Sequence, residues 1–215
     1  MKNFCTMLIM GAVLMTACSA KTVSAQTSTG GSGSRILVVY FTMPETDGVD
    51  TVAGASRLAV NGEVLGNTEH VARTIHRHTG GDMFVIKTVQ TYPGTHGPLL
   101  EFAQKERAAN TRPALAVSAG NLDQYDTIFL GFPIWYADLP MALYSFLEQT
   151  DFSGKILIPF STHGGSQFSN TINTIIRLQP NAGVARNGFT VSRNSIAWSE
   201  QDITQWLEGL GFTQP

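Results

Sequence analysis

The segment YDTIFLGFPIWY, residues 125–136, holds a short buried strand followed by an aromatic loop. Residues 127–130 form an apolar run after a polar turn, and the following glycine is expected to end the strand. Pro133 is not expected to continue a central strand, because proline offers no N–H to the ladder. Trp135 and Tyr136 then lie past the carboxyl end of the strand, where open parallel sheets bind ligands. Two neighbouring aromatics suit a flat, apolar, electron-poor ring better than a sugar or a peptide.

Further strand patterns lie on both sides of this segment and alternate with helical patterns. Strands are expected at 35–42, 82–87, 155–160 and 188–191, and helices at 67–79, 98–110, 138–150, 169–178 and 200–210. Five strands that alternate with five helices predict an α/β protein, with a doubly wound parallel sheet between two helical layers. Such sheets bind ligands at the point where the strand order reverses.

The N-terminal 34 residues differ from the rest in composition. Residues 1–17 resemble an export signal, with Lys2 ahead of an apolar run that is too short to span a bilayer. The sequence before Cys18 resembles a lipobox, which predicts a lipid anchor on Cys18, whereas cleavage after Ala25 is the alternative. Residues 18–34 are expected to be a flexible Gly/Ser/Thr-rich tether, so the folded domain is expected at 35–215.

The composition excludes several classes of function. The chain has 215 residues, 43% hydrophobic and 14% charged, with a formal net charge of −2. No basic patch is evident, so nucleic acid is not an expected partner. Both cysteines precede the domain, and no metal-ligand spacing occurs, so any redox chemistry requires a bound cofactor.

An unusual insert separates the first strand from the first helix. Residues 43–65 begin as a loop and continue as two short alternating runs around Asn61-Gly62, the strongest short hairpin signal. We expect a β-hairpin there, and a solvated acidic loop around Glu45. The helix at 67–79 is expected to be capped by Asn67 or Thr68, with solvent-exposed histidines.

Three loops are expected to meet at the carboxyl edge of the sheet. The first contains Thr42 and residues 66–68 at a helix N-terminus, which suits a phosphate. It has no P-loop lysine, so a nucleoside triphosphate is not indicated. The second loop, 133–136, supplies aromatic faces. The third, 162–166, supplies glycines that allow close backbone approach, together with His163.

In this set and order, the segments ILVVYFT, GNT, GFPIWY and STHGGS resemble those of flavodoxin-like FMN-binding proteins, over nearly everything after the tether. The resemblance implies the strand order 2-1-3-4-5 and FMN as cofactor. It implies that phosphate is held by Thr42, Gly66, Asn67 and Thr68, and that the flavin ring is flanked by Pro133, Ile134, Trp135, Tyr136, Thr162, His163, Gly164 and Gly165. The insert is a departure from the family pattern, and the phosphate loop closes only if its two ends come together.

Within the insert, residues 50–56 are similar to the acceptor motif of exported proteins that carry FMN on a Thr or Ser. Ser56 would be the acceptor, and a small-residue turn beside the phosphate is the alternative. No catalytic residue can be assigned, although Tyr92 and His163 are candidates. Tyr92 would lie near the ring edge or cap the core, and His163 would donate a hydrogen bond to reduced flavin or be fixed by backbone contacts.

Two functions follow from the resemblance. The first is an exported FMN-dependent oxidoreductase, periplasmic or in the cell envelope, that reduces quinones or other small acceptors. The second is a non-enzymatic electron-transfer protein that docks redox partner proteins. Carriers of that kind are usually strongly acidic, whereas this chain is only mildly so, which favours the enzyme.

Overall fold

The computed structural model describes residues 35–47, 57–60 and 62–212. Its central sheet has the order β4-β1-β5-β6, and both β7 and β8 pair with β6. The strands are β1 (Ile36–Tyr40), β4 (Asp82–Val85), β5 (Thr127–Pro133), β6 (Ile156–His163), β7 (Gly183–Val184) and β8 (Phe189–Ser192). With β8 as the fifth strand, the predicted parallel 2-1-3-4-5 order is confirmed. The two-residue β7 is an addition, too short to produce a periodic pattern.

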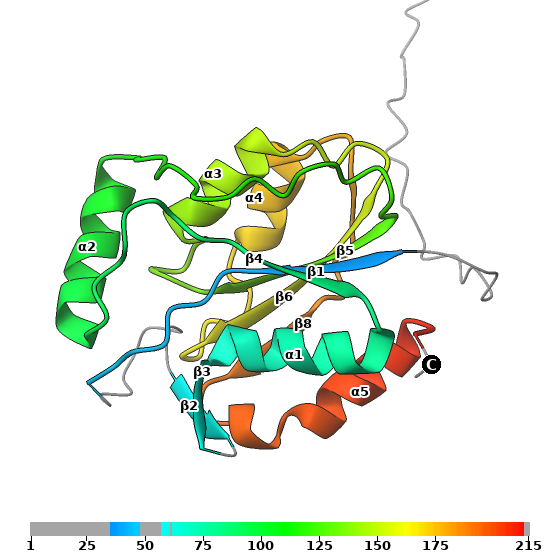
Figure 1. Ribbon diagram of the computed structural model, residues 1–215, viewed down its shortest axis with the longest axis horizontal. Helices are drawn as coiled ribbons and strands as arrows, with labels where there is room; N and C mark the ends of the chain where they lie inside the picture. Colours follow the sequence, from blue (N-terminus) through cyan, green and yellow to red (C-terminus); the bar gives the residue numbers. More distant parts are fainter. Residues whose placement is uncertain (1–34, 48–56, 61, 213–215) are drawn as a thin grey trace, which may run out of the picture.

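Helices cover both faces of this sheet (Figure 1). On one face lie α1 (Asn67–Thr79) and α5 (Glu200–Gly209), which follows the short 3-10 helix η1 (Ile196–Trp198). On the other face lie α2 (His96–Ala108), α3 (Met141–Gln149) and α4 (Thr171–Leu178). Strand β1 contributes Leu37 and Val39 to one core and Val38 and Tyr40 to the other. Burial on both faces explains its continuous apolar sequence.

Strand β5 extends further than the sequence predicts. Its pairing with β1 ends at Gly131, opposite Tyr40, but its pairing with β6 continues until Pro133 lies opposite Thr162. The N–H of Ile134 donates to Thr162 O at 2.9 Å, so the nitrogen of Pro133 faces the other side, where β1 has ended. The expectation that Pro133 lies outside the strand is therefore wrong, because no ladder partner requires its N–H there.

Strand β6 also extends into an expected loop. Residues Ser161, Thr162 and His163 lie within the strand, paired with Thr190, Val191 and Ser192 of β8. The loop therefore begins at Gly164. All of β6 from Leu157 to His163 is buried, because helices and strands surround it on every side.

The predicted hairpin is confirmed as an antiparallel pair of β2 (Arg57–Val60) and β3 (Glu63–Gly66). Strand β3 runs directly into α1 (Figure 1). Arg73 of α1 donates to both carboxylate oxygens of Glu63, at 2.7 and 2.9 Å. The hairpin is thus attached to α1 by the chain and by a bidentate ion pair.

Several side chains are placed differently from the expectations. His70 and His78 of α1 are buried, with His78 Nε2 2.9 Å from Phe212 O, because α1 packs against α5 and the C-terminal segment. On the same side of the sheet, Trp206 packs against Phe129, whereas Trp198 is 78% exposed.

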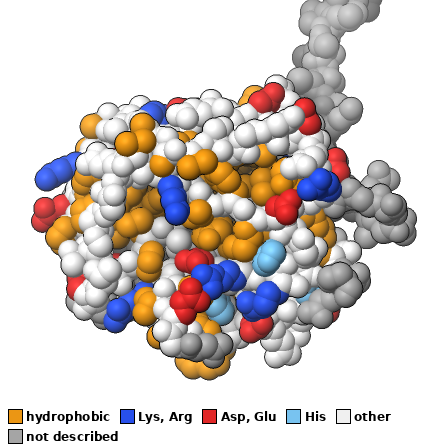
Figure 2. All heavy atoms as spheres, in the orientation of Figure 1, with side chains coloured by type: hydrophobic (Ala, Val, Ile, Leu, Met, Phe, Trp, Pro, Cys, Tyr) orange, Lys and Arg blue, Asp and Glu red, His pale blue; other side chains and the backbone are white. Residues whose placement is uncertain are grey.

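Some expectations lie outside the described residues: the export segment 1–17, the tether 18–34 with Cys18, Ser56 and Asn61. No helix in the described part of the chain has the length and apolar character needed to cross a bilayer. In the view of Figure 2, acidic and basic side chains are interspersed rather than gathered by sign.

Candidate functional site

The N-terminus of α1 presents polar groups without a protein partner. Asn67 is 1% exposed, and neither polar atom of its amide is hydrogen-bonded to any residue that the structure describes. Gly66 is the N-cap, and no side chain caps the helix, so the expectation that Asn67 or Thr68 caps it is wrong: both lie inside it. Buried amide groups normally find partners, so these atoms indicate a ligand position. The positive end of the helix favours an anion there.

Thr42 reaches this helix end in spite of the insert. A Cβ added to Gly66 would lie 1.9 Å from Thr42 Oγ1, so the two residues are in close contact and only glycine fits. The loop therefore closes, as the resemblance requires. We refer to Thr42, Gly66, Asn67 and Thr68 as the α1 cradle.

Thr162 connects the cradle to the strands beside it. The hydroxyl oxygens of Thr68 and Thr162 lie 2.8 Å apart in a buried position, and Thr162 O accepts the N–H of Ile134. The first turn of α1, the end of β6 and the end of β5 are thus held together at one point.

The loop after β5 is a tight turn. The backbones of Trp135 and Asp138 exchange two hydrogen bonds of 3.0 Å, and the intervening Tyr136 and Ala137 have φ of 50° and 60°. Neither residue is glycine, so this left-handed geometry is strained. The Tyr136 hydroxyl donates to Leu100 O of α2 at 2.8 Å, and its side chain is 38% exposed.

Trp135 and Ile134 point inward from this turn rather than toward solvent. Trp135 is 5% exposed, and its ring packs edge-on against Phe41 and Tyr92, at centroid distances of 5.5 and 5.6 Å. Its indole N–H has no partner among the described residues. Contact of Trp135 or Tyr136 with a flavin remains a prediction.

The end of β6 places His163 in a buried position. The N–H of Gly165 donates to His163 Nδ1 at 2.9 Å, so Nδ1 is an acceptor and the neutral ring carries its proton on Nε2. Burial lowers the pKa of His163. Gly165 has φ of 141°, a conformation that favours glycine and so explains the glycine at this position.

Comparison with known proteins gives one decisive result. The family model for flavodoxins matches residues 56–210, which cover α1 and every element after it. The chain belongs to the flavodoxin family. Strand β1 and Thr42 precede the matched residues, whereas the hairpin β2–β3 lies within them.

Solved structures agree with this assignment. A candidate flavoprotein from Bacteroides uniformis is 26% identical, with a TM-score of 0.61 over 82% of this chain and 99% of its own. One from Bacteroides eggerthii is 24% identical, with a TM-score of 0.59 over 83% and 99%. A Lactobacillus acidophilus flavoprotein in complex with FMN shares the fold at 17% identity, with a TM-score of 0.54 over 81% and 99%. No curated protein matches the sequence.

The sequence analysis of this flavodoxin missed a buried acid beside the packed rings of Phe41, Tyr92 and Trp135. The Tyr92 hydroxyl donates to Glu106 Oε2 at 2.7 Å, and both residues are buried. Burial raises the pKa of Glu106, against a smaller opposite effect of the Tyr92 hydrogen bond. Glu106 shares one face of α2 with the buried Leu99 and Ala103, and this spacing is the signal that would have found it.

A second missed feature fastens the start of the insert. Glu45 is 2% exposed, so the expected solvated acidic loop is wrong at this residue. Its carboxylate lies 2.6 Å from His96 Nδ1, and the N–H of His96 donates to Asp47 at 2.9 Å. Thr46 donates from both its N–H and its hydroxyl to Gly94 O. We call residues 45–47 the strap, since they join the end of the β1 segment to the start of α2.

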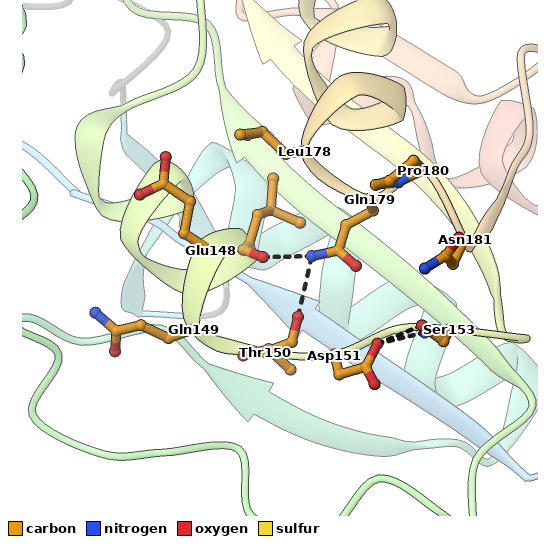
Figure 3. A pocket seen from close by; sticks show the side chains of 10 residues that line it. Glu148, Gln149, Thr150, Asp151, Ser153, Leu178, Gln179, Pro180 and Asn181 are labelled. Carbon is orange, nitrogen blue, oxygen red and sulfur yellow. Dashed lines mark hydrogen bonds between the residues drawn. The ribbon is translucent and has the colours of Figure 1, made fainter.

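Two cavities lie at opposite edges of the sheet. One of about 390 Å³ lies at the carboxyl ends of β1 and β4 and includes Thr42 in its wall. The other, of about 450 Å³, lies between the C-terminal ends of α3 and α4 (Figure 3). There the amide of Gln179 donates to Leu147 O and Thr150 O and accepts from Phe152 N, so its hydrogen bonds are satisfied.

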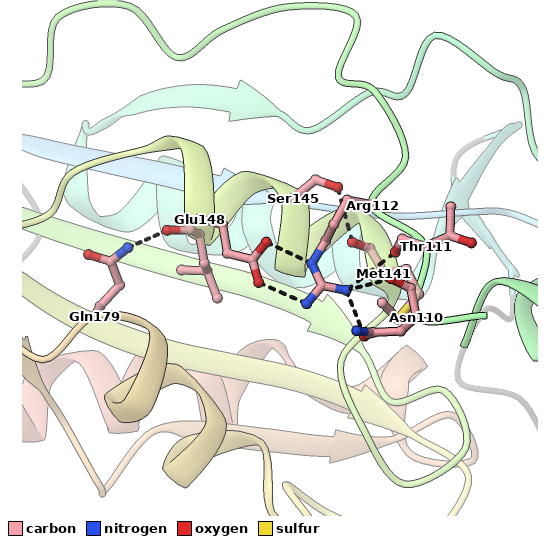
Figure 4. A network of polar contacts seen from close by, with 8 residues as sticks. Asn110, Thr111, Arg112, Met141, Ser145, Glu148 and Gln179 are labelled. Carbon is pink, nitrogen blue, oxygen red and sulfur yellow. Dashed lines mark hydrogen bonds and ion pairs between the residues drawn. The ribbon is translucent and has the colours of Figure 1, made fainter. Parts of the chain in front are cut away.

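The polar network of Figure 4 also belongs to that distant edge. Arg112 binds both carboxylate oxygens of Glu148 at 2.7 and 2.8 Å and donates to Asn110 O. These contacts fix the segment after α2 to α3, so we assign them a structural role.

Proposed function

We propose that the protein is an FMN-dependent oxidoreductase that acts outside the cytoplasm and reduces quinone-like or other small acceptors. The observation that carries this proposal is the α1 cradle, where the amide of Asn67 is buried without a partner at the N-terminus of α1. The chain's place in the flavodoxin family makes FMN the anion-bearing ligand that these residues fit best.

The residues divide into two groups around the cofactor. The cradle would hold the phosphate through the Thr42 and Thr68 hydroxyls, the Asn67 amide and the first N–H groups of α1. The carboxyl ends of β5 and β6, together with the turns that follow them, would flank the ring. They contain Pro133, Ile134, Trp135, Tyr136, Thr162, His163, Gly164 and Gly165.

His163 suits a donor role toward the ring. Its Nδ1 already accepts a hydrogen bond from the N–H of Gly165. The neutral imidazole of His163 can therefore donate only through Nε2–H. A buried neutral donor stabilises negative charge on a neighbouring group without requiring reorganisation. Reduction of a quinone to a hydroquinone takes two electrons and two protons, which the cofactor supplies on returning from its reduced to its oxidised form.

Export and anchoring are part of the proposal. They rest on residues 1–17, the lipobox-like sequence before Cys18 and the tether that follows. Intact mass of the membrane fraction tests the anchor, because lipidation of Cys18 adds the mass of the acyl groups. A soluble product that begins at Gln26 would instead support cleavage after Ala25.

A visible spectrum of the mature protein, before and after acid precipitation, tests cofactor and attachment together. Yellow colour that moves to the supernatant indicates non-covalent FMN. Colour that stays in the pellet, and is lost in Ser56→Ala, indicates attachment at Ser56. A protein that shows no flavin band even after FMN is added would overturn the proposal.

Substitution of Asn67 tests the cradle itself. We expect Asn67→Ala to weaken FMN binding by about 10-fold, the loss of one to two hydrogen bonds to a charged group. Asn121→Ala, in an exposed loop, is the matched control. Anaerobic reoxidation of the photoreduced protein by 1,4-naphthoquinone then tests the activity. A rate that saturates with quinone supports an enzyme, and reaction only with redox proteins supports a carrier.

A further inference from the structure

The cavity at the carboxyl ends of β1 and β4 has the size of a small-molecule site. Its volume is about 390 Å³, within the usual range for ligand pockets. It adjoins the α1 cradle through Thr42, which lies in its wall. A ligand in this cavity would therefore lie next to any ligand in the cradle. Tyr92, which is expected near the ring edge or as a cap of the core, lines this cavity, whereas residues 133–136 and 162–165 do not.

The decisive residue in this cavity is Tyr40, the last residue of β1. Tyr40 is 7% exposed, yet its hydroxyl forms no hydrogen bond with any residue that the structure describes. Burial, with a smaller contribution from the Glu69 carboxylate, raises the pKa of Tyr40 to about 12. The hydroxyl thus stays protonated at neutral pH and can donate to a ligand. The hydroxyl oxygen is not itself among the fully buried atoms, so it is open to solvent and can donate to a ligand atom that displaces a water molecule.

The other walls define the shape and polarity of that ligand. Phe41, Val85, Ile86 and Tyr92 provide apolar and aromatic surface, which suits a flat apolar body. The polar residues of the wall are Lys87, Thr88, Thr91 and Glu69. The carboxylate of Glu69 is engaged by two N–H donors of Arg73, at 3.1 and 2.7 Å, but Arg73 also binds Glu63, so one cation is shared between two carboxylates.

We propose that this cavity binds the electron acceptor, and that the acceptor is a planar carbonyl compound whose carbonyl oxygen accepts a hydrogen bond from the Tyr40 hydroxyl. This inference rests on the proposed oxidoreductase function, because that function supplies the neighbouring cofactor. The strap closes the same region, since residues 45–47 bind residues 94–96 just beyond the cavity residues Met43 and Tyr92. The acceptor would enter beside the strap.

The test measures binding without turnover. Mature protein, with and without FMN, is titrated with 1-indanone, a planar aromatic ketone, and amide chemical shifts are followed by NMR. We expect saturable one-to-one binding in both forms. Tyr40→Phe should raise the dissociation constant for 1-indanone about 3- to 10-fold, the effect of one hydrogen bond, and change that for FMN less than about 2-fold.

Two further variants provide a control and an independent test of the cavity. Tyr125→Phe is the matched control, because its hydroxyl donates to Asp82 at the amino edge of the sheet, and it should bind 1-indanone normally. Thr91→Phe fills the cavity from an exposed loop position and should abolish 1-indanone binding while the protein remains folded.

The outcomes separate this inference from the function on which it rests. Absence of saturable 1-indanone binding overturns the inference even if FMN binds. Competition between 1-indanone and FMN, or equal weakening of both by Tyr40→Phe, also overturns it, because the cavity would then belong to the flavin site. A third outcome is that the protein never takes up FMN but binds 1-indanone normally, and that Tyr40→Phe weakens this binding. That outcome would support the carbonyl site and contradict the proposed oxidoreductase function.

Discussion

The hydroxyl oxygens of Thr68 and Thr162 lie 2.8 Å apart in a buried position between α1 and β6. The two residues are separated by 94 positions in the sequence. This single contact fixes the α1 cradle to the strand that carries His163. The relative positions of the expected phosphate and ring sites therefore depend on it.

Removal of one of these hydroxyls should destabilise the protein. Thr68→Val and Thr162→Val each leave a buried hydroxyl without this partner, so each should lower the free energy of unfolding by about 1–2 kcal/mol. The double variant should lose about 1 kcal/mol less than the sum of the two, because the second substitution no longer breaks this hydrogen bond. Urea denaturation of the apoprotein measures all three. Strictly additive losses would show that the two hydroxyls do not interact in solution.

The contact between Gly66 and Thr42 gives a rescue experiment. Gly66→Ala places a Cβ 1.9 Å from Thr42 Oγ1, so the loop must shift, at a cost of about 1–3 kcal/mol. Thr42→Ala removes that oxygen and leaves a contact of 3.1 Å with the Thr42 Cβ. The double variant should therefore regain most of the stability that Gly66→Ala loses, as measured by thermal unfolding. Failure of rescue would mean that Thr42 does not lie at the helix end.

Glu106 should make stability depend on pH. Burial raises the pKa of its carboxyl, so the folded protein binds this proton more tightly than the unfolded chain does. The stabilisation is complete below the ordinary pKa of glutamate and is lost as pH rises through the raised pKa. Glu106→Gln keeps an acceptor for Tyr92 but cannot titrate. As pH rises from about 4, the unfolding free energy of the wild type should therefore fall relative to that of Glu106→Gln. A difference between the two that does not change with pH would contradict this prediction.

His163 should show the opposite dependence. Burial lowers the pKa of His163, so the folded protein binds its proton less tightly than the unfolded chain does. The contribution of neutral His163 to the stability of the fold is complete above the ordinary histidine pKa of about 6.5. This contribution declines as pH falls through the lowered pKa of the folded protein. NMR of the imidazole nitrogens should find the proton on Nε2 and a midpoint below about 6.5. A proton on Nδ1 would contradict the hydrogen bond from Gly165.

The sequence predicts most of the fold because its signals are local. The alternation of apolar runs and helical patterns identifies all five long strands, and Asn61-Gly62 identifies the hairpin. Boundaries fail where tertiary pairing decides them. Pro133 remains in β5 only because the pairing of β5 with β1 ends at Gly131, before Pro133 is reached. No pattern within residues 125–136 contains that information.

The candidate site is predicted less completely for the same reason. The glycines and threonines of the cradle are visible in the sequence, since few residue types suit a helix N-terminus. The buried acid Glu45 is not, because charged residues are usually exposed and its burial depends on a distant partner, His96. Glu106 is indicated only by its helical spacing with Leu99 and Ala103, and its partner Tyr92 is not indicated at all. The unpartnered Tyr40 hydroxyl likewise emerges only when the walls of its cavity are known.

The hairpin β2–β3 has a practical consequence. It lies in the loop that precedes α1, yet Arg73 and Glu63 fasten it to the helix while Thr42 meets Gly66 independently of the hairpin tip. Length added between Val60 and Glu63 therefore need not disturb the cradle. The tip of the hairpin offers a position at which a peptide epitope or fluorescent reporter can be grafted while the α1 cradle stays unchanged.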